Sequence, residues 1–264
     1  METPSKNSAV SAVEIIELTL ENFADYGVCG YKDMKKHKEL RRKFSWFEKY
    51  HSKGLRCKII VSEKNESQGM IEYLPGELAH RPVKADGYLF IHCLFVGFRK
   101  EFKGRGFASK LIDECIEDAR QQNKKGVTVV TRKGSFMVRK DIFLKKGFQQ
   151  VDSAHPDFEL LVLKFDDLDK NPSFNIREER KYGPGVTVIR SAQCPYSVKN
   201  VDSILTTAKN LGLETRLIEL EEMENEQSSP CAFGTFCILF NDQIISHHPI
   251  SNKRFENIMK KMLS

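Results

Sequence analysis

The sequence predicts an α/β (α+β) protein in which a mixed sheet flanked by helices is followed by a smaller α/β unit. Segments with the two-residue period of strands alternate with segments that have the 3.6-residue period of amphipathic helices. A polar stretch marked by Pro172, Gly183 and Pro184 separates these segments into two groups. The length, 264 residues, also fits two domains of ordinary size.

Strand signals dominate the first group. Alternating and β-branched residues predict the strands, and the breaks between them fall at Asn65-Glu66-Ser67 and in the loop from Pro75 to Pro82. The predicted strands span residues 14–20, 56–62, 69–74, 88–98, 127–131 and 159–165. Since the second, third and fourth of these follow one another closely, we expect them to form an antiparallel meander.

The helices of the first group are predicted from the spacing of apolar residues. In residues 108–119, apolar side chains recur every three or four positions and therefore share one face. Residues 38–50 form a charged amphipathic run, and residues 136–146 end at Gly147, a residue type that commonly terminates helices. These helices are expected to pack on the sheet.

The second group has the same alternation on a smaller scale, without a repeat of the sequence. Strands are predicted at residues 186–190, 215–219, 236–240 and 244–247, and helices at residues 197–211 and 252–263. The last two strands flank Asn241-Asp242, which favours a hairpin turn. We therefore divide the chain into a flexible N-terminal tail (1–12), a first domain (13–165), a linker (166–183) and a second domain (184–264).

Composition limits the class of protein. Hydrophobic residues make up 40% of the chain and charged residues 30%, so the chain can bury a core and is not disordered throughout. No window is apolar over the ~18 residues that a membrane helix requires, and the start lacks a signal-peptide pattern, so we expect a soluble, cytoplasmic protein. The seven cysteines are scattered, which favours reduced thiols and no structural metal site.

Positive charge is concentrated in the first domain. Lys and Arg outnumber Asp and Glu by 34 to 27 before Pro184 and are outnumbered by 8 to 9 from there on. No basic stripe is interleaved with aromatic residues, so nucleic acid is not an expected partner. The excess favours an anionic ligand such as a soluble polyphosphate, although a solvated lysine-rich surface would give the same count.

The most informative segment runs from Phe98 to Ser109, between a predicted strand and a predicted helix. Gly104 and Gly106 let the backbone bend so that successive N–H groups point outward, and the helix adds the positive end of its dipole. These features predict a site for a pyrophosphate. The Gly-Lys-Ser or Gly-Lys-Thr of a Walker loop is absent, and Ser109 stands where a dinucleotide fingerprint needs a third glycine.

The residues Lys103-x-x-Gly106-x-Ala108 resemble the [Gln/Arg]-x-x-Gly-x-[Gly/Ala] loop of the GNAT acyltransferases, with Lys in place of Gln or Arg. The order of predicted elements over residues 13–165 resembles the GNAT order, and Lys145–Phe148 is similar to the recurrent K-x-G-F of that family. A more specific resemblance, to the YoaP-type acetyltransferases, is carried by the C-terminal unit and by Ile71–Pro75 and Ile91–Val96.

This resemblance implies an acyl-CoA-dependent N-acetyltransferase that transfers an acetyl group directly from acetyl-CoA to an amine on a small molecule or peptide. Acetyl-CoA or coenzyme A would be the co-substrate, and no metal is implied. The pyrophosphate would lie on the loop amides, and an N–H of the preceding strand would polarise the thioester carbonyl. The residues implied in cofactor binding are Val96, Phe98, Lys103, Gly104, Arg105, Gly106, Ala108 and Ser109.

The acceptor amine must be neutral to attack, so a base is needed. His92 is the first candidate, because imidazole suits that role and because even spacing would place it on one strand face with Val96 and Phe98. A half-buried histidine that bonds a backbone carbonyl is an equal alternative. Glu72, on the neighbouring strand, is the second candidate for the base.

The proton for the departing thiolate is a separate question. Many GNAT enzymes use a tyrosine at the position held here by Phe143. Another group such as Ser135, or water, would then have to supply the proton, or the thiolate would leave unprotonated.

The motif Cys194-Pro195-Tyr196-Ser197 resembles the site of glutaredoxin-like proteins and implies a thioredoxin-like second domain. A helix N-terminus favours a thiolate, so Cys194 is the predicted reactive thiol. The motif holds one cysteine, and Gly234-Thr235 stand where a cis-proline is usual, which favours a module that binds substrate, shields the active site or forms a homodimer. Two alternative functions stay open: a monothiol redox or thiol-handling protein that uses Cys194, and a catalytically silent CoA-binding sensor.

Overall fold

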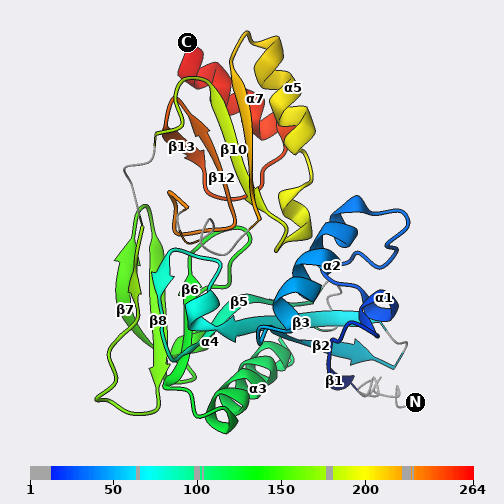
Figure 1. Cartoon of the computed structure of the whole chain (residues 1–264), viewed down its shortest axis with the longest axis vertical. Coiled ribbons are helices and arrows are strands. Elements are labelled where there is room, and N and C mark those ends of the chain that lie inside the picture. The colour runs from blue at the N-terminus through cyan, green and yellow to red at the C-terminus, as the bar shows by residue number, and fades with distance from the viewer. Residues whose placement is uncertain are drawn as a thin grey trace, which may run out of the picture.

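The computed structural model describes residues 13–63, 66–97, 102, 104–176, 181–221, 227 and 229–264. The predicted N-terminal tail, residues 1–12, lies outside the described residues. The described chain forms two main sheets, one above the other in Figure 1, with helices packed on both.

A seven-stranded mixed sheet forms the N-terminal part of the molecule. Its strands, in spatial order, are β1 (Val13–Glu17), β2 (Arg56–Ser62), β3 (Ser67–Pro75), β5 (Leu89–Val96), β6 (Gly126–Thr131), β8 (Phe158–Lys164) and β7 (Gln149–Ala154). Only β5 and β6 are parallel among these neighbouring pairs. The predicted meander corresponds to β2, β3 and β5, and the predicted fold class, a mixed sheet flanked by helices, is confirmed.

Helices cover both faces of this sheet. They are α1 (Phe23–Tyr26), α2 (Lys38–His51), α3 (Phe107–Gln121) and α4 (Asp141–Leu144), with a 3-10 turn, η1 (Gly76–Leu78). Because neighbouring strand residues point to opposite faces, Ile60 and Ile71 join the apolar cluster around α3, whereas Ile59 and Met70 join the cluster around α1 and α2. Each face of the central strands is therefore buried.

The C-terminal part holds a four-stranded sheet. Its spatial order is β11 (Thr215–Leu220), β10 (Val186–Ser191), β12 (Phe236–Phe240) and β13 (Gln243–Ser246), and its helices are η3 (Pro195–Ser197, a 3-10 turn), α5 (Val201–Asn210) and α7 (Asn252–Leu263). The β10–β11 pair is parallel and the other two pairs are antiparallel. Helices α5 and α7 contact each other, as Figure 1 shows.

The two parts share a buried core. Phe90, Val130 and Phe158 of the first sheet belong to the same apolar cluster as Ile238 of β12 and Phe255 of α7. The segment between the two parts also contacts the first one, because β9 (Ser173–Phe174) pairs with β4 (Val83–Lys84). The second sheet therefore packs directly on the first, and part of the predicted linker forms a strand.

Further differences from the prediction concern residues 136–146, strand β7 and residues 197–211. The expected helix over residues 136–146 is wrong in its first half: Phe136 takes a left-handed φ of 66°, and the helix is confined to Asp141–Leu144. Strand β7 is absent from the prediction because its residues are mostly polar and half-exposed. The expected helix over 197–211 divides at Asn200, whose φ of 68° separates η3 from α5.

Candidate active site

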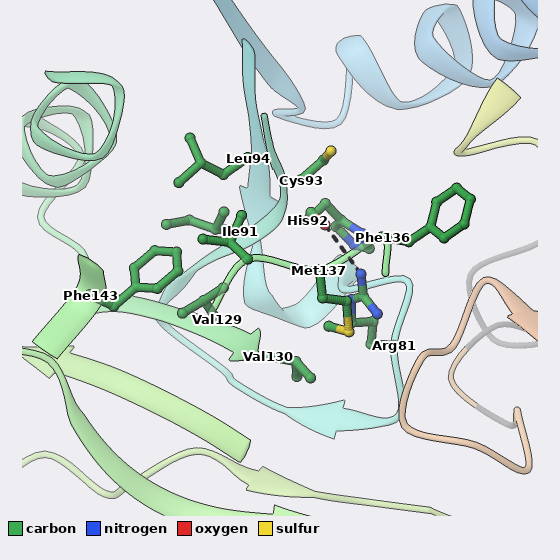
Figure 2. Close-up of a pocket in the computed structure, with 11 residues that line it drawn as sticks. Arg81, Ile91, His92, Cys93, Leu94, Val129, Val130, Phe136, Met137 and Phe143 are labelled. Carbon is green, nitrogen blue, oxygen red and sulfur yellow. Dashed lines mark hydrogen bonds between the residues drawn. The ribbon is translucent and has the colours of Figure 1, made fainter. Parts of the chain in front are cut away.

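Strands β5 and β6 separate shortly after they meet. They pair over three residues only, Leu89–Ile91 with Val127–Val129. Past this point the backbone groups of β5 on that side no longer pair with β6, so they can bind an extended ligand. A cavity of about 30 Å³ lies at the point of separation (Figure 2). Its lining residues are Arg81, Ile91, His92, Cys93, Leu94, Val129, Val130, Phe136, Met137, Val138 and Phe143.

A β-bulge in β5 places His92 in this cavity. Glu72 of β3 pairs with Cys93, and the next residue, Tyr73, pairs with Ile91, so His92 is the extra residue of β5. The bulge breaks the even spacing used in the sequence prediction. His92 consequently packs near Trp46 of α2, at a ring separation of 6.5 Å, whereas Val96 packs on the α3 side of the sheet. The expectation that these two side chains share a face is therefore wrong.

His92 is buried and uncharged at neutral pH. Burial lowers its pKa well below the ordinary value for histidine, and the neighbours His80, Arg81 and Lys43 lower it further. Its Nε2 accepts a hydrogen bond of 2.8 Å from the backbone N–H of His80. This bond selects the tautomer that carries its hydrogen on Nδ1, which has no hydrogen-bond partner among the described residues. The expected bond to a backbone carbonyl is not the one observed.

Glu72 lies at the contact between the two parts of the molecule. Its side chain is 0% exposed and pairs with the Nζ of Lys43, whose side chain is 1% exposed. The other carboxylate oxygen accepts a 2.7 Å hydrogen bond from Nε2 of Gln193 in the C-terminal part. A buried carboxylate needs such partners, since an unpaired charge in the interior is costly. Both oxygens of Glu72 are thus engaged.

The loop before α3 has the backbone geometry that the sequence predicts. Gly104 and Gly106 have φ values of 71° and 76°, in the region that favours glycine. A Cβ placed on either residue would meet no other described atom within 4 Å, so the space in front of both is open. Gly106 precedes the first turn of α3, and among the described residues no side chain caps this helix end. The N–H groups of that turn are available to an anion.

The other predicted cofactor-binding residues fall into two sets. Ala108 and Ser109 lie in the first turn of α3, Arg105 lies between the two glycines, and Val96 ends β5 opposite Gly69 of β3. Phe98 and Lys103 lie outside the described residues. The described members thus gather where β5 ends and α3 begins.

Phe143 is 0% exposed and lines the cavity beside β5 and β6 (Figure 2). Its ring packs edge-on against Phe148, with centroids 5.4 Å apart. Phenylalanine has no hydroxyl group, so this side chain cannot donate a proton. Ser135, the alternative named from sequence, is exposed.

Cys194 belongs to a group of side chains at the contact between the two parts. We define this interdomain cluster as Cys29, Lys43, Glu72, Cys93, Gln193 and Cys194. Burial raises the pKa of the Cys194 thiol, against hydrogen bonds from the Tyr196 and Ser197 backbone that lower it. Burial also raises the pKa of Cys93 to about 12. Neither thiol is therefore a thiolate at neutral pH.

Three residues of this region were missed by sequence reasoning. Lys43 carried a usable signal: it lies on the same helix face as Leu40 and Phe47, which is the buried face of α2. Arg81 and Gln193 carried none, because their partners are distant in sequence. Arg81 donates a hydrogen bond of 3.3 Å to the His92 carbonyl (Figure 2). It also donates to the Phe233 carbonyl, and so connects the cavity to the C-terminal part.

The described parts of the chain show neither a metal-binding cluster nor a membrane-spanning helix. No group of three or more His, Cys, Asp or Glu residues there could hold a metal ion. Within the same residues, every helix is too short or too polar to cross a lipid bilayer.

Known proteins resemble this chain over both of its parts. Residues 16–138 match the Acetyltransferase (GNAT) family, and residues 215–257 match the family described as YoaP-like. The uncharacterised N-acetyltransferase YoaP of Bacillus subtilis (strain 168) is 27% identical over 252 residues, which cover 94% of this chain and 98% of that protein.

Solved structures align with the larger part of the chain. The GNAT family N-acetyltransferase YhbS of Escherichia coli, in complex with CoA, is 10% identical with a TM-score of 0.41 and covers 65% of this chain and 93% of its own. The PaiA N-acetyltransferase of Thermoplasma acidophilum, in complex with coenzyme A, is 13% identical with a TM-score of 0.41 and covers 58% and 99%. From the family matches, the chain carries a GNAT acetyltransferase domain followed by a YoaP-like domain.

Proposed function

We propose that this protein transfers an acetyl group directly from acetyl-CoA to the amine of a small molecule or peptide. The observation that carries the proposal is the separation of β5 from β6 beside the glycine bend that opens α3. Acetyl-CoA supplies an activated acyl thioester when it is bound. The chain supplies two binding features: unpaired strand backbone for the extended arm of the co-substrate, and an anion site for its pyrophosphate.

The residues present fit the phosphate end of such a co-substrate. Gly104 and Gly106 leave open space where side chains would otherwise stand, and α3 directs its N-terminal N–H groups and dipole toward that space. Arg105, Ala108 and Ser109 complete the described part of this site. We include Lys103, Phe98 and Val96 in the proposed site as the sequence resemblance implies.

His92 is the residue we propose for handling the proton, with Glu72 second. An unprotonated imidazole can accept a proton, and the low pKa of His92 keeps it unprotonated through neutral pH. To act as the base, Nε2 must give up its hydrogen bond from the His80 N–H and accept one from the acceptor amine. Without this exchange, Nδ1–H could donate a hydrogen bond that stabilises the departing thiolate, but it could not supply the proton that a tyrosine at the position of Phe143 would give. Glu72 is already held by Lys43 and Gln193, which ranks it behind His92.

The C-terminal part is proposed to shield the acceptor side of this site. The strand order β11-β10-β12-β13 with one parallel pair supports a thioredoxin-like fold for residues 184–264. Gln193 binds Glu72, and Tyr196 donates a 3.0 Å hydrogen bond to the Cys29 carbonyl, so the Cys194 motif faces the first sheet rather than solvent. The raised pKa of Cys194 disfavours thiol chemistry at this motif.

Acetyl transfer is tested by incubating the full-length protein with acetyl-CoA and a library of amines and following the release of free thiol. Transfer to at least one amine, with the acetylated product identified by mass, would support the proposal. Coenzyme A at a hundredfold excess over its dissociation constant should stabilise the fold by about 2.7 kcal/mol. An unchanged melting temperature at millimolar coenzyme A would remove the cofactor assignment.

The role of His92 is tested by the pH dependence of turnover. If His92 is the base, His92→Ala should lose far more activity at pH 7 than at pH 9, where more of the amine is already neutral. Equal losses at both pH values would exclude His92 as the base and leave it only a role as a hydrogen-bond donor. No loss at either pH would remove His92 from the chemistry.

A further inference from the structure

A second group of chemically active side chains lies in the C-terminal part, away from the proposed transfer site. We define this thiol pocket as Cys231, Cys237 and His247 together with the cavity beside them. The cavity measures about 290 Å³, and Cys231 and His247 both line it. It is therefore large enough for a small solute and has a thiol and an imidazole in its wall.

Strand pairing brings Cys237 and His247 together. Ile238 of β12 lies opposite Ser246 of β13 in an antiparallel pair, so the residues next to them, Cys237 and His247, lie beside each other. The ring of Phe158 in β8 packs edge-on against His247, with centroids 5.6 Å apart. The imidazole is thus held from both the second sheet and the first.

Cys231 reaches the same place from the loop before β12. A turn closed by the Gly234 N–H and the Cys231 carbonyl, 2.9 Å apart, precedes the strand. The Cys231 thiol donates a hydrogen bond of 3.6 Å to the carbonyl of Phe236, the residue before Cys237. Since Phe236 precedes Cys237 in β12, this bond places Cys231 next to Cys237, and a movement of the two side chains would allow a disulfide.

The electrostatics of the two thiols differ. Hydrogen bonds from Cys237 and His247 lower the pKa of Cys231 well below the ordinary thiol value, although burial opposes them. The same contact and burial raise the pKa of Cys237 well above that value. His155 and Asp242 also line the cavity, and Asp242 is held by the backbone N–H groups of Tyr182 and Gly183 at 2.5 and 3.0 Å. Cys231 is thus suited to be the attacking thiol, and Cys237 to be the thiol that then forms a disulfide with it.

We propose that Cys231 reacts with small hydroperoxides and then forms a reversible disulfide with Cys237. The sulfur of Cys231 attacks one peroxide oxygen and the O–O bond breaks. The other oxygen leaves with the thiol proton as water or an alcohol, and Cys231 becomes a sulfenic acid. The sulfur of Cys237 then attacks the sulfenic sulfur, the S–O bond breaks and the hydroxyl leaves with the Cys237 proton as water. Two thiols are oxidised and one hydroperoxide is reduced.

The test uses the reduced full-length protein and hydrogen peroxide. Peptide mapping without reductant should show the Cys231–Cys237 disulfide, an intact mass lower by two hydrogens, and reversal by dithiothreitol. Cys237→Ser should stop at the sulfenic acid on Cys231, which dimedone traps. Cys231→Ser should abolish both products, and Cys115→Ser, which removes a buried thiol of α3, should change neither.

The contribution of His247 is measured by the rate of disulfide formation. His247→Gln should slow it by about tenfold, because the fraction of Cys231 in the thiolate form falls. The wild-type protein alone can overturn the proposal. Oxidation of Cys194 or Cys115 before Cys231, or a protein that keeps Cys231 and Cys237 as thiols while peroxide oxidises its methionines, would do so.

Discussion

Cys194 and Cys231 stand in the same C-terminal sheet region but in opposite chemical surroundings. Cys194 immediately precedes η3, a 3-10 turn of three residues, and burial raises the pKa of its thiol. Cys231 lies in a loop with no helix end, and hydrogen bonds with Cys237 and His247 lower the pKa of its thiol against the effect of burial. The pKa of the first thiol is raised and that of the second is lowered.

This difference indicates that direct hydrogen bonds change the pKa of a thiol more than the N-terminus of a very short helix does. A macrodipole needs several aligned peptide units, and η3 has only three residues. At Cys194 that small effect does not overcome burial at the contact between the two parts. Cys231 is more buried than the half-buried Cys194, yet hydrogen bonds with Cys237 and His247 lower the pKa of its thiol. The reactivity of a thiol therefore depends on the groups that contact it in space, and these groups cannot be read from the sequence motif around Cys194.

The largest expected effect concerns the charges beside Cys194. Lys43→Met should destabilise the protein by about 3–5 kcal/mol, because it leaves the Glu72 carboxylate buried without its cation. Lys43→Met combined with Glu72→Leu should return to within about 2 kcal/mol of the wild type, since no buried charge is left. Urea unfolding of the three proteins measures this. A double variant as unstable as the single one would show that the pair holds the two parts together for another reason.

The next effect separates the transfer site from the thiol pocket. Gly106→Glu should reduce acetyl transfer by about a hundredfold or more, equal to about 2.7 kcal/mol of barrier, because a carboxylate would occupy the proposed phosphate site. Gly212→Glu is the matched control, since Gly212 has a φ of 74° and equally open space after α5. It should keep activity within about threefold.

Both glycine variants should form the Cys231–Cys237 disulfide at the wild-type rate. A loss of acetyl transfer in Gly212→Glu as large as in Gly106→Glu would mean that backbone strain, and not the lost anion site, causes the defect.

A smaller effect is expected from the buried histidine on the first sheet. The folded-state pKa of His92 lies below the unfolded value near 6.5, so the unfolded chain binds more protons as the pH falls below that value. Stability is therefore fully present above about pH 6.5 and is lost on acidification toward the folded pKa. In His92→Leu the slope of stability between pH 6.5 and 5 should be shallower by up to about 1.4 kcal/mol per pH unit.

The control for this measurement is His155→Gln, which changes an exposed histidine and should leave the slope as in the wild type. Thermal melts across the pH range give both slopes. An unaltered slope in His92→Leu would mean that His92 does not resist protonation in the folded state.

The smallest expected effect is that of Cys194→Ser. Acetyl transfer and peroxide-driven disulfide formation should each change by less than about twofold, because a protonated, half-buried thiol contributes packing rather than chemistry. Parallel kinetic assays of the two activities measure this. A tenfold loss in either one would restore Cys194 as the reactive thiol and reverse the comparison with Cys231.

Much of the fold followed from local patterns. Periodicity located β2, β3, β5, β6 and α3 because these elements bury regular apolar faces. It failed at β7, where polar residues form an edge strand. It also failed at Phe136, whose left-handed conformation prevents the helix from beginning there, so that α4 begins only at Asp141. Among the site residues, Gly104 and Gly106 were predictable because their conformation is a property of the residue type. The face occupied by His92 was not, because one extra residue in β5 reverses the alternation.

The sequence by itself determined the order of elements, the glycine bend before α3 and the GNAT and YoaP-like resemblance, because each depends on residues close together in the chain. The tertiary structure decided the rest. Lys43 meets Glu72, Gln193 crosses to the same carboxylate, and Cys231 reaches Cys237 and His247 only when separate strands and helices pack. Charge and thiol reactivity depend on distance in space, and distances between segments far apart in sequence are set by packing alone.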